Sequence, residues 1–415
     1  MVMKKTFATV AISLVLSQIL LVGISSASVK PGAICKKAGQ TILSSGKKYT
    51  CVKSGKNFVW SKGVLVKATP VKAPAPVPTP SLTPTPEPTP SATPTPAPTP
   101  TFTAPARPTS FSDLLEKADG ISYWAWATSS EKIKGASEQS IEVEVLFGPK
   151  TPVIEHNTAR AVQLVSKLYS GVAAPKKVVA IYFSYEDRSW GQTTFWKYAY
   201  RPNGNETVNM CQSPLTCWGA MAETDYKGTG ILLMSVNDPS KLDQTHTSGP
   251  LQAHEFAHTF QTTQFLGTPK EPNTYCCVKQ YLPWWSVEGG AHFVEGSAMN
   301  ADSYEDYKAW IKKTMSDFKG NDKDKFTKAW FENFLQPAST SLWGTEPYQW
   351  KIYSGGALVE EIFVALKGPD ISMKLMRDVA TGLMWPEAFE KNFGISWSAA
   401  LPILAETLVA KIAKS

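Results

Sequence analysis

The chain has 415 residues, of which 43% are apolar and 19% are charged, and this balance excludes a wholly disordered protein. Its 14 tryptophans exclude a coiled coil or a collagen-like fibre. The net charge of +7 is unevenly divided, because residues 1 to 72 contain 12 Lys and no acidic residue, whereas residues 110 to 415 contain 29 basic and 34 acidic residues. The larger part is therefore mildly acidic, and we expect no basic groove for nucleic acid there.

The first 27 residues have the order of features found in an export signal. Lys4 and Lys5 precede an apolar stretch over residues 7 to 24, and small residues occupy positions 25 to 27. This order predicts a signal peptide, 1–27, that is cleaved after Ala27 and places the protein outside the cell or on its surface. Retention as an uncleaved anchor is the alternative. No later stretch of the chain is long and apolar enough to be expected to span a membrane.

Residues 28–66 are predicted to form a small basic β-module. Short apolar runs alternate there with Gly, Ser and Lys turns, and the segment contains Cys35 and Cys51. In an exported chain we expect these two cysteines to form a disulfide. The ten lysines from Lys30 to Lys72, with no acidic residue among them, favour contact with anionic wall polymers or a membrane surface. A β-module that is merely soluble is the alternative.

A proline-rich segment follows the module. Fifteen of the 31 prolines fall between Pro70 and Pro108, in repeats of Thr-Pro and Ala-Pro. This composition predicts an extended polyproline linker over residues 67–109, between the module and residues 110–415. A plain linker and a spacer that crosses a cell wall both remain open.

Mixed α and β structure is expected from Ser110 onward. Apolar residues at helical spacing predict a helix over residues 155–170. Runs of β-branched, aromatic and other apolar residues predict strands at 178–185 and 230–236.

Four further cysteines, Cys211, Cys217, Cys276 and Cys277, lie in this part of the chain. Four cysteines allow three pairings, and a ring closed by two adjacent residues is strained. We therefore expect cross-pairing between the two loops rather than a bridge between Cys276 and Cys277, with the partners left open. Zinc binding by these cysteines is not expected, because they lack the two-residue spacing of a zinc ribbon.

Residues 251–260 read LQAHEFAHTF and contain the pattern H-E-x-x-H at positions 254 to 258. On a helix, His254 and His258 lie on one face a turn apart, so both imidazoles can reach one metal ion, and Glu255 can face a water on that ion. Imidazole suits zinc, and a catalytic zinc site needs a third protein ligand and an open position. Two core histidines on an amphipathic helix are the alternative.

The segment YLPWWSVEGGAHFVEG, residues 281–296, offers the third ligand. Pro283 can open a helix, and Glu288 would lie in its first turns. The small residues Gly289 and Gly290 would let another helix approach closely. Glu295 is a second acidic candidate, without the W-x-x-E-G context of Glu288.

H-E-x-x-H followed by a Glu in W-x-x-E-G resembles the gluzincin zinc metallopeptidases, and the spacing is similar to that of peptidase-MA-like members. The resemblance implies that His254, His258 and Glu288 bind Zn²⁺ and that Glu255 is the general base. It covers about residues 155–408. It implies an α+β fold, with a zincin-type domain that has a mixed sheet, an HExxH helix and a mostly helical C-terminal half.

Many gluzincins carry an acidic residue four positions after the ligand Glu, where it hydrogen-bonds a ligand histidine, whereas this chain has His292. Hydrogen bonding to a ligand imidazole, direct metal binding and a partly exposed position without a role are the alternatives for His292.

Residues 348–366 are predicted to contain a helix with a Gly pair near its start. In aminopeptidase-like gluzincins, a Y-x-x-G-[AG] element supplies a tyrosine that stabilises the oxyanion, and Tyr353 matches this position. Packing at the helix start and a role for Tyr348 instead are the alternatives. Residues 378–408 resemble the C-terminal tail of peptidase-MA-like proteins, in which a Gly-Ile-Ser-Trp turn joins two helices.

The resemblance implies peptide-bond hydrolysis by a zinc-activated water, with Glu255 moving the proton and Tyr353 donating to the oxyanion. It also implies that the strand at 230–236 is the sheet edge that pairs with an extended substrate. Trp284, Trp285 and Trp343 are candidates to line the cleft, with core packing as the alternative.

A catalytically inactive zincin-fold protein for surface binding or adhesion is the alternative function. Glu255 favours the enzyme. This residue is not expected to bind zinc, so a purely structural zinc site would not need it. We expect a peptide or protein substrate, no nucleic-acid partner and no cofactor besides zinc, with internal and terminal cleavage both open.

Overall fold

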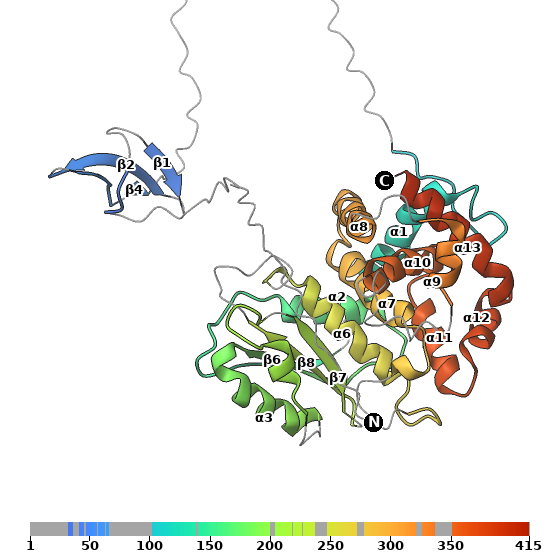
Figure 1. Ribbon diagram of the computed structural model, residues 1–415. Helices are drawn as coiled ribbons and strands as arrows, with labels where there is room; N and C mark the ends of the chain where they lie inside the picture. Colours follow the sequence, from blue (N-terminus) through green and yellow to red (C-terminus); the bar gives the residue numbers. More distant parts are fainter. Residues whose placement is uncertain are drawn as a thin grey trace, which may run out of the picture. The chain divides into compact units, whose positions relative to one another are not determined.

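The computed structural model divides the chain into two units, Met1–Ala97 and Pro98–Ser415, which we consider separately (Figure 1). The predicted signal peptide and most of the predicted linker lie outside the residues that the structure describes. The described residues are 32–35, 41–44, 47–55, 57–62, 64–65, 102–137, 140–199, 204–217, 219–225, 227–236, 247–271, 278–320, 326–336 and 351–414.

The first unit contains a four-stranded antiparallel sheet in which β2 pairs with the other three strands. A disulfide joins Cys35 to Cys51, and both side chains are buried. The predicted bridge and the small β-structure around it are therefore confirmed. The strands are β1 (Thr41–Ser44), β2 (Lys47–Ser54), β3 (Asn57–Trp60) and β4 (Val64–Leu65).

A four-stranded mixed sheet begins the second unit. Its strands are β5 (Glu142–Phe147), β6 (Lys177–Phe183), β7 (Ala220–Thr224) and β8 (Thr229–Ser235). The spatial order is β5, β6, β8, β7, with β7 antiparallel to β8 and the other pairs parallel. Both predicted strands are present, but the prediction that residues 230–236 form the sheet edge is wrong. The hairpin from β7 to β8 places β7 outside β8, so β7 rather than β8 is the edge strand on this side of the sheet.

The two faces of this sheet pack against different helices, because successive side chains of a strand point to opposite faces. Alternate residues of β6, beginning at Val178, belong to the main core together with α2 (Thr158–Leu168) and α6 (Pro250–Thr263). The others, beginning at Val179, belong to a second cluster with α3 (Arg188–Ala199). In Figure 1, α3 and α6 lie on opposite sides of the sheet. The helix predicted near α2 and the helix predicted for H-E-x-x-H are both confirmed.

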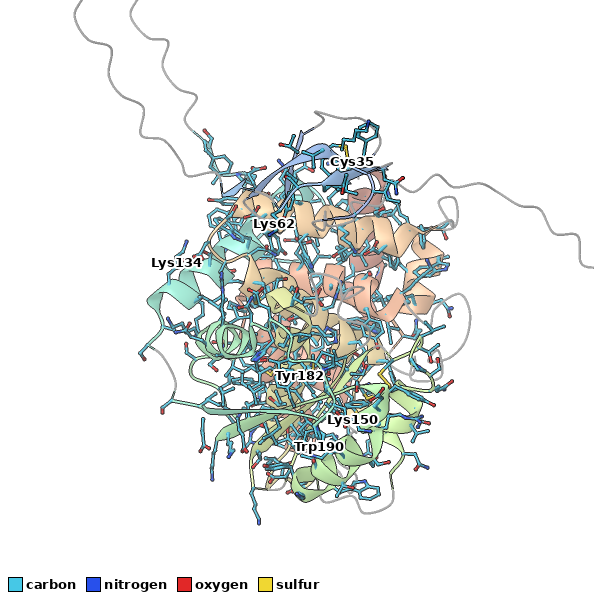
Figure 2. The ribbon with its side chains drawn as sticks, turned by 90° about the vertical axis from the view of Figure 1, so that its left-hand side faces the viewer. Cys35, Lys62, Lys134, Lys150, Tyr182 and Trp190 are labelled. Atoms are coloured by element: carbon cyan, nitrogen blue, oxygen red, sulfur yellow. A yellow bond between two sulfur atoms is a disulfide. The ribbon has the colours of Figure 1, made fainter. Side chains whose placement is uncertain are left out.

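Tyr182 of β6, which is labelled in Figure 2, connects the sheet to α6 through a hydrogen bond. Its hydroxyl oxygen lies 2.8 Å from Thr158 Oγ1 of α2 and accepts a hydrogen bond from Gln252 Nε2 of α6 at 3.0 Å. All three side chains are buried. Because Gln252 comes two residues before His254, this contact fixes the part of α6 that carries the first histidine.

Helices form most of the rest of the second unit, and α7 and α10 approach each other very closely. A Cβ atom on Gly289 would collide with the backbone of Gly356, and one on Gly356 would collide with the carbonyl group of Trp285. The close approach predicted for Gly289 is therefore confirmed. These helices are α1 (Ile121–Gly135), α7 (Trp284–Met299), α8 (Tyr304–Lys319), α9 (Lys328–Phe334), α10 (Lys351–Lys367), α11 (Ile371–Ala380), α12 (Trp385–Phe393) and α13 (Trp397–Ala413).

Cys211 and Cys217 are bonded to each other, so the predicted cross-pairing of the two cysteine loops is wrong for this pair. Helix α4 (Glu206–Met210) ends just before Cys211, and a turn follows in which the Thr216 amide donates to the Ser213 carbonyl oxygen. This turn places the two cysteines opposite each other as an antiparallel bridge, with Cα atoms 3.8 Å apart. Cys276 and Cys277 lie outside the described residues.

The second unit is thus an α+β structure with a mixed sheet and mostly helical content. Figure 1 shows the sheet and its flanking helices on one side, α8 to α13 on the other, and α6 and α7 between them. Gly394, at φ +73°, begins the predicted Gly-Ile-Ser-Trp turn between α12 and α13. No single helix in the described segments has the length and apolarity to cross a membrane, although α12 and α13, bent by 77°, meet these criteria as a pair.

Candidate metal centre and cleft

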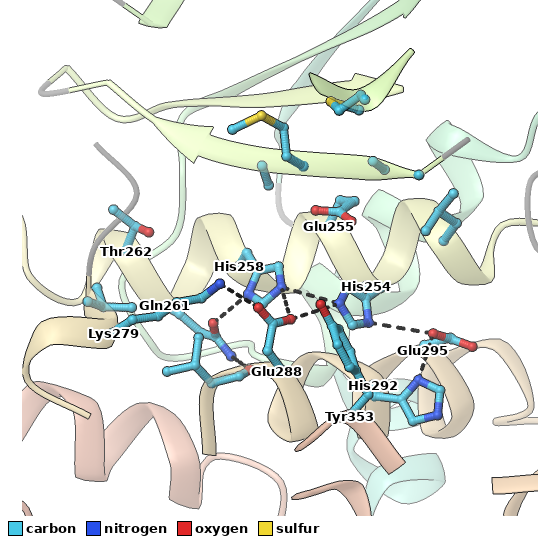
Figure 3. Close-up of a pocket in the computed structure, with 18 of the residues that line it drawn as sticks. His254, Glu255, His258, Gln261, Thr262, Lys279, Glu288, His292, Glu295 and Tyr353 are labelled. Carbon is cyan, nitrogen blue, oxygen red and sulfur yellow. Dashed lines mark hydrogen bonds and ion pairs between the residues drawn. The ribbon is translucent and has the colours of Figure 1, made fainter. Parts of the chain in front are cut away.

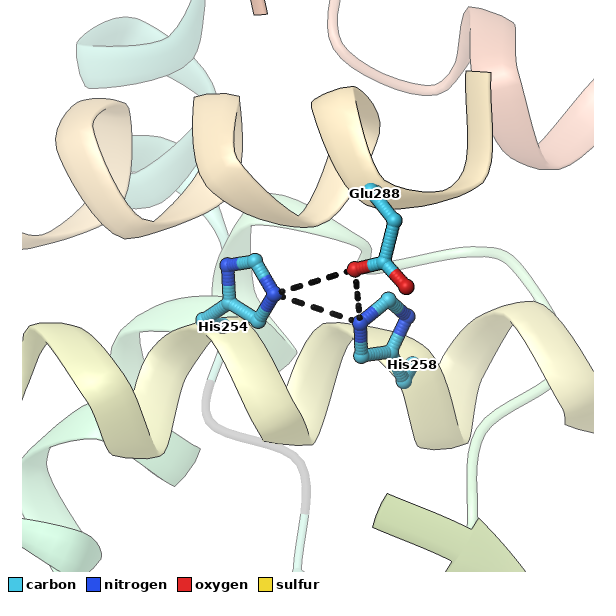
Figure 4. A group of neighbouring side chains, drawn as sticks. All are labelled: His254, His258 and Glu288. Atoms are coloured by element: carbon cyan, nitrogen blue, oxygen red, sulfur yellow. Dashed lines mark hydrogen bonds and ion pairs between the residues drawn. The ribbon is translucent and has the colours of Figure 1, made fainter. Parts of the chain in front are cut away.

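Helices α6 and α7 bring three potential metal donors together. His254 Nε2 and His258 Nε2 are 3.2 Å apart, and Glu288 Oε2 lies 3.5 Å from the former and 3.2 Å from the latter (Figure 4). Ligand atoms about 2.0–2.1 Å from a tetrahedral metal ion are about 3.3 Å apart. The three atoms therefore have the spacing of three corners of a tetrahedral site, which leaves one corner for a further ligand.

The local sequence explains how these side chains meet. His254 and His258 are one turn apart in α6, which Pro250 begins. Pro283 occupies the N-cap position of α7, and Glu288 follows in the second turn. His254 and Glu288 are buried, and His258 is partly exposed. The sequence prediction that these three residues converge agrees with the observed geometry.

Each imidazole has a further partner on its other ring nitrogen. His254 Nδ1 lies 3.5 Å from Glu295 Oε2, and His258 Nδ1 lies 2.8 Å from Gln261 Oε1. The Gln261 amide nitrogen donates in turn to the Val287 carbonyl oxygen of α7 at 2.8 Å (Figure 3). Partners of this kind fix a ring and leave Nε2 to a metal ion. These buried His and Glu side chains fit a metal ion.

Glu295 lies on the opposite edge of the His254 ring from Glu288. Its Oε2 is also 3.1 Å from His292 Nδ1, so His254, His292 and Glu295 form a second group of donor atoms that could hold an ion. The two groups share the single ring of His254. We therefore interpret Glu295 as the acceptor for His254 Nδ1–H, and His292 as the partner of Glu295 rather than of the ligand imidazole.

Burial and neighbouring charges set the ionisation of the donor group. Burial lowers the pKa of His254, but hydrogen bonds with Glu288 and Glu295 outweigh this effect and raise that pKa to about 10. Burial opposes ionisation of Glu288 as well, yet Lys279 and His258 hold its pKa well below the usual range. A proton on His254 and a metal ion are therefore alternative counter-charges for the same carboxylates.

A cavity of about 900 Å³ opens onto the donor atoms, and residues 220 to 222 of the edge strand β7 form part of its wall. Glu255 also lines the cavity, is 5% exposed, and points to the side of α6 that faces the sheet (Figure 3). Burial raises the pKa of its carboxyl group. Glu255 thus shares a space with the donor atoms of His254, His258 and Glu288 without being one of them.

Tyr353 of α10 lies in the same cavity. Its ring stacks on that of His254, with centroids 5.9 Å apart and planes inclined by 30°. Burial, followed by the negative charges of Glu288 and Glu255, raises the pKa of the Tyr353 hydroxyl, which therefore stays protonated at neutral pH. Tyr348, the alternative donor, lies outside the described residues.

The tryptophans considered as cleft residues have other positions. Trp285 is 1% exposed and stacks on Trp397 in the core, so core packing is confirmed for this residue. Trp284 lies under the ammonium group of Lys279, and neither tryptophan lines the cavity. Trp343 lies outside the described residues.

Some residues of the site were not predicted from the sequence. Gln261 lies three residues after His258, and helical spacing alone could have indicated it. Lys279 comes from a short 3₁₀ segment between α6 and α7, and Gln212 and Thr216, which also line the cavity, come from the turn closed by the disulfide. No periodicity marks these three residues in the sequence.

Comparisons with known proteins assign no family or function to the site. No protein-family model matches the chain, and neither a curated protein nor a solved structure matches it. The function is therefore inferred from the residues of the site.

Proposed function

We propose that the protein is a secreted or cell-surface metallopeptidase of the gluzincin type, with a zincin-type fold, that uses zinc to hydrolyse peptide bonds. The convergence of His254, His258 and Glu288, with Glu255 beside them in one cavity, carries this proposal. Two imidazoles, one carboxylate and one open position form a ligand set that is known from catalytic zinc sites. The two disulfides are compatible with a location outside the cytoplasm.

The side chains of the cavity have complementary roles in this reaction. Bound zinc would supply a Lewis acid that polarises the scissile carbonyl group and acidifies a water. Glu255 accepts the water proton on its carboxylate and passes it to the leaving nitrogen, and its raised pKa suits a group that binds and then releases a proton. Tyr353 keeps its hydroxyl proton and donates a hydrogen bond to the developing oxyanion.

An extended peptide is the substrate that the cavity wall favours. Among the described strands, β7 pairs with β8 and lies at the end of the sheet. An edge strand offers backbone N–H and C=O groups to which an extended peptide can add. Met210, Met221 and Leu251 give the same cavity apolar surface for substrate side chains.

The replacement Glu255→Gln tests this function. We expect the parent chain and the variant each to contain about one zinc, because Glu255 is not a ligand. Only the parent should cleave a mixed peptide library efficiently, with a loss of about 100-fold or more in the variant. The control Glu305→Gln removes an exposed carboxylate of α8 and should change neither result. Equal cleavage by parent and Glu255→Gln would remove Glu255 from the mechanism, and a parent without zinc would contradict the metallopeptidase.

A further inference from the structure

A lysine contacts the carboxylate of Glu288 on the oxygen that the histidines do not face. Lys279, in the short helix η4 (Val278–Gln280), places Nζ 2.5 Å from Glu288 Oε1, whereas Oε2 faces the two imidazoles. The ammonium group also lies 4.3 Å from the ring centroid of Trp284. A carboxylate and an aromatic ring, both on α7, therefore hold Lys279 at the cavity wall (Figure 3).

We propose that Lys279 is a positioning residue that makes Glu288 bind a metal ion through only one of its two carboxylate oxygens. A carboxylate can bind a metal ion through one oxygen or through both. The hydrogen bond from an ammonium group to a carboxylate is charge-assisted and short. Because Lys279 engages Oε1, only Oε2 is available to an ion held by His254 and His258. This inference rests on the metal site of the proposed function, but not on peptidase activity.

Ligation through one oxygen keeps the number of protein donor atoms at three. A tetrahedral ion bound by His254, His258 and one oxygen of Glu288 has its fourth position open to the cavity. If the second oxygen of Glu288 also bound the ion, the protein would supply four donor atoms instead of three. Lys279 therefore keeps a coordination position for a ligand that enters from the cavity.

The same contact sets the charge around the ion. Two neutral imidazoles and one carboxylate supply a single negative charge. The ammonium group of Lys279 partly neutralises that charge, because it pairs with the other oxygen of Glu288. Less of the positive charge of the ion is then neutralised. The ion is consequently a stronger Lewis acid, and it is held less tightly than it would be without Lys279.

Cobalt(II) in place of zinc tests this inference, because its visible absorption weakens when four-coordinate geometry becomes five-coordinate. We expect the full-length parent to give the strong four-coordinate spectrum and Lys279→Met to give a weaker one, since Oε1 of Glu288 becomes free to bind. Lys279→Arg keeps a positive charge beside Glu288 and should give a spectrum closer to that of the parent than Lys279→Met does. Zinc affinity, measured by competition with a chromophoric chelator, should rise about tenfold in Lys279→Met, because a nearby positive charge is removed.

A matched control replaces a lysine that has similar contacts elsewhere. Lys270 lies 5.6 Å from the ring centroid of Tyr281 and donates to the Leu383 carbonyl oxygen. Lys270→Met should therefore leave both the cobalt spectrum and the zinc affinity unchanged.

A folded Lys279→Met chain with the cobalt spectrum and zinc affinity of the parent would overturn the inference. Should this variant fail to fold, zinc K-edge X-ray absorption of the parent decides between the two ligation modes. Four nearest donor atoms support ligation through one oxygen, and five or more with a second carboxylate oxygen overturn it. A parent that binds cobalt as expected but cleaves no peptide contradicts only the peptidase, whereas a parent that takes up no metal overturns both proposals.

Discussion

On α7, positions 288, 292 and 295 lie along one helix face, because steps of four and three residues each complete about one turn. Glu288 points its Oε2 at the Nε2 atoms, and Glu295 reaches the Nδ1 atom of the same His254 ring from a position two turns further on. His292, at the position between them, contacts Glu295. Glu295 thus serves as the acceptor for His254. The gluzincin resemblance implies an acidic residue at position 292 for this role instead.

We expect Glu295→Leu to lower zinc affinity about 10- to 100-fold, because His254 loses the partner that orients its ring. The double variant His292→Asp with Glu295→Leu returns an acid to the position usual in gluzincins and should recover part of the affinity. Competition with a chromophoric chelator measures both effects. His292→Gln is the control and should cause a smaller loss, since Glu295 keeps its contact with His254. Wild-type affinity in Glu295→Leu would refute the orienting role of Glu295.

At the scale of helices, α10 and α11 meet through a buried carboxyl group. Glu360 of α10 is 4% exposed, and its Oε1 accepts a hydrogen bond from Ser372 Oγ of α11. Burial raises the pKa of Glu360 to about 7, above the value near 4.3 of an exposed Glu. The folded state therefore favours the protonated carboxyl group. Its contribution to stability is fully present below about pH 4.3 and is lost as the pH rises through 7.

Glu360→Gln should remove this pH dependence, because glutamine is neutral at every pH. We expect the parent to lose about 3 kcal/mol of unfolding free energy relative to the variant between about pH 4.5 and pH 8. Urea unfolding of both proteins at four pH values in this range gives the difference directly. A difference that stays constant with pH would show that Glu360 does not titrate there.

A second prediction about the helices concerns the close glycine contact between α7 and α10. Gly356→Ala places a Cβ against the backbone of Gly289 and Trp285, which cannot rotate away. We expect a loss of about 1–3 kcal/mol in the free energy of unfolding, measured in urea. Zinc affinity should fall as well, since the displaced α7 carries Glu288. Gly135→Ala at the end of α1, where a Cβ meets no atom within 4 Å, is the control, and equal stability of both variants would contradict this account.

Elements marked by a local motif or a helix-start residue could be predicted from the sequence. The helix that contains H-E-x-x-H and the helix that Pro283 begins both form, and with them the meeting of His254, His258 and Glu288 could be anticipated. Local patterns show which segments are strands but not their order in space. The gluzincin resemblance implies that residues 230–236 form the sheet edge, whereas the short strand β7 occupies it.

Contacts that depend on tertiary packing could not be read from the sequence. The pairing of Cys211 with Cys217 depends on a tight turn, and four cysteines alone allow three pairings. Lys279 reaches Glu288 from a short 3₁₀ helix that has no amphipathic pattern. Such residues are placed by their three-dimensional neighbours rather than by local spacing.

Within the second unit, α6 contacts both the sheet and helix α7. Its sheet side is anchored through Tyr182 and Gln252, and Glu255 points to that side, toward the cavity wall formed by β7. Its opposite side is anchored to α7 through Gln261 and carries the two histidines toward Glu288. The candidate metal donors and the edge strand therefore lie on two walls of one cavity, as the proposed hydrolysis of a strand-like substrate requires.

The whole chain combines this mildly acidic unit with a lysine-rich first unit, and the difference in charge leads to a prediction about binding. We expect the protein to bind purified anionic wall material at about 0.1 M salt and to dissociate at about 1 M, because the Debye length falls from about 10 Å to about 3 Å. Lys53 and Lys62 of the first unit are exposed, so the pair of substitutions Lys53→Glu and Lys62→Glu should weaken binding in a sedimentation assay.

Two exposed lysines of the second unit, Lys134 and Lys150, provide the matched control (Figure 2). Their replacement by Glu changes the net charge of the chain by the same amount, and it should leave binding nearly unchanged if the first unit makes the contact. An equal loss in both pairs would assign the attraction to net charge alone. Binding that persists at about 1 M salt would contradict an electrostatic contact, because charges on the surface are then screened within a few ångströms.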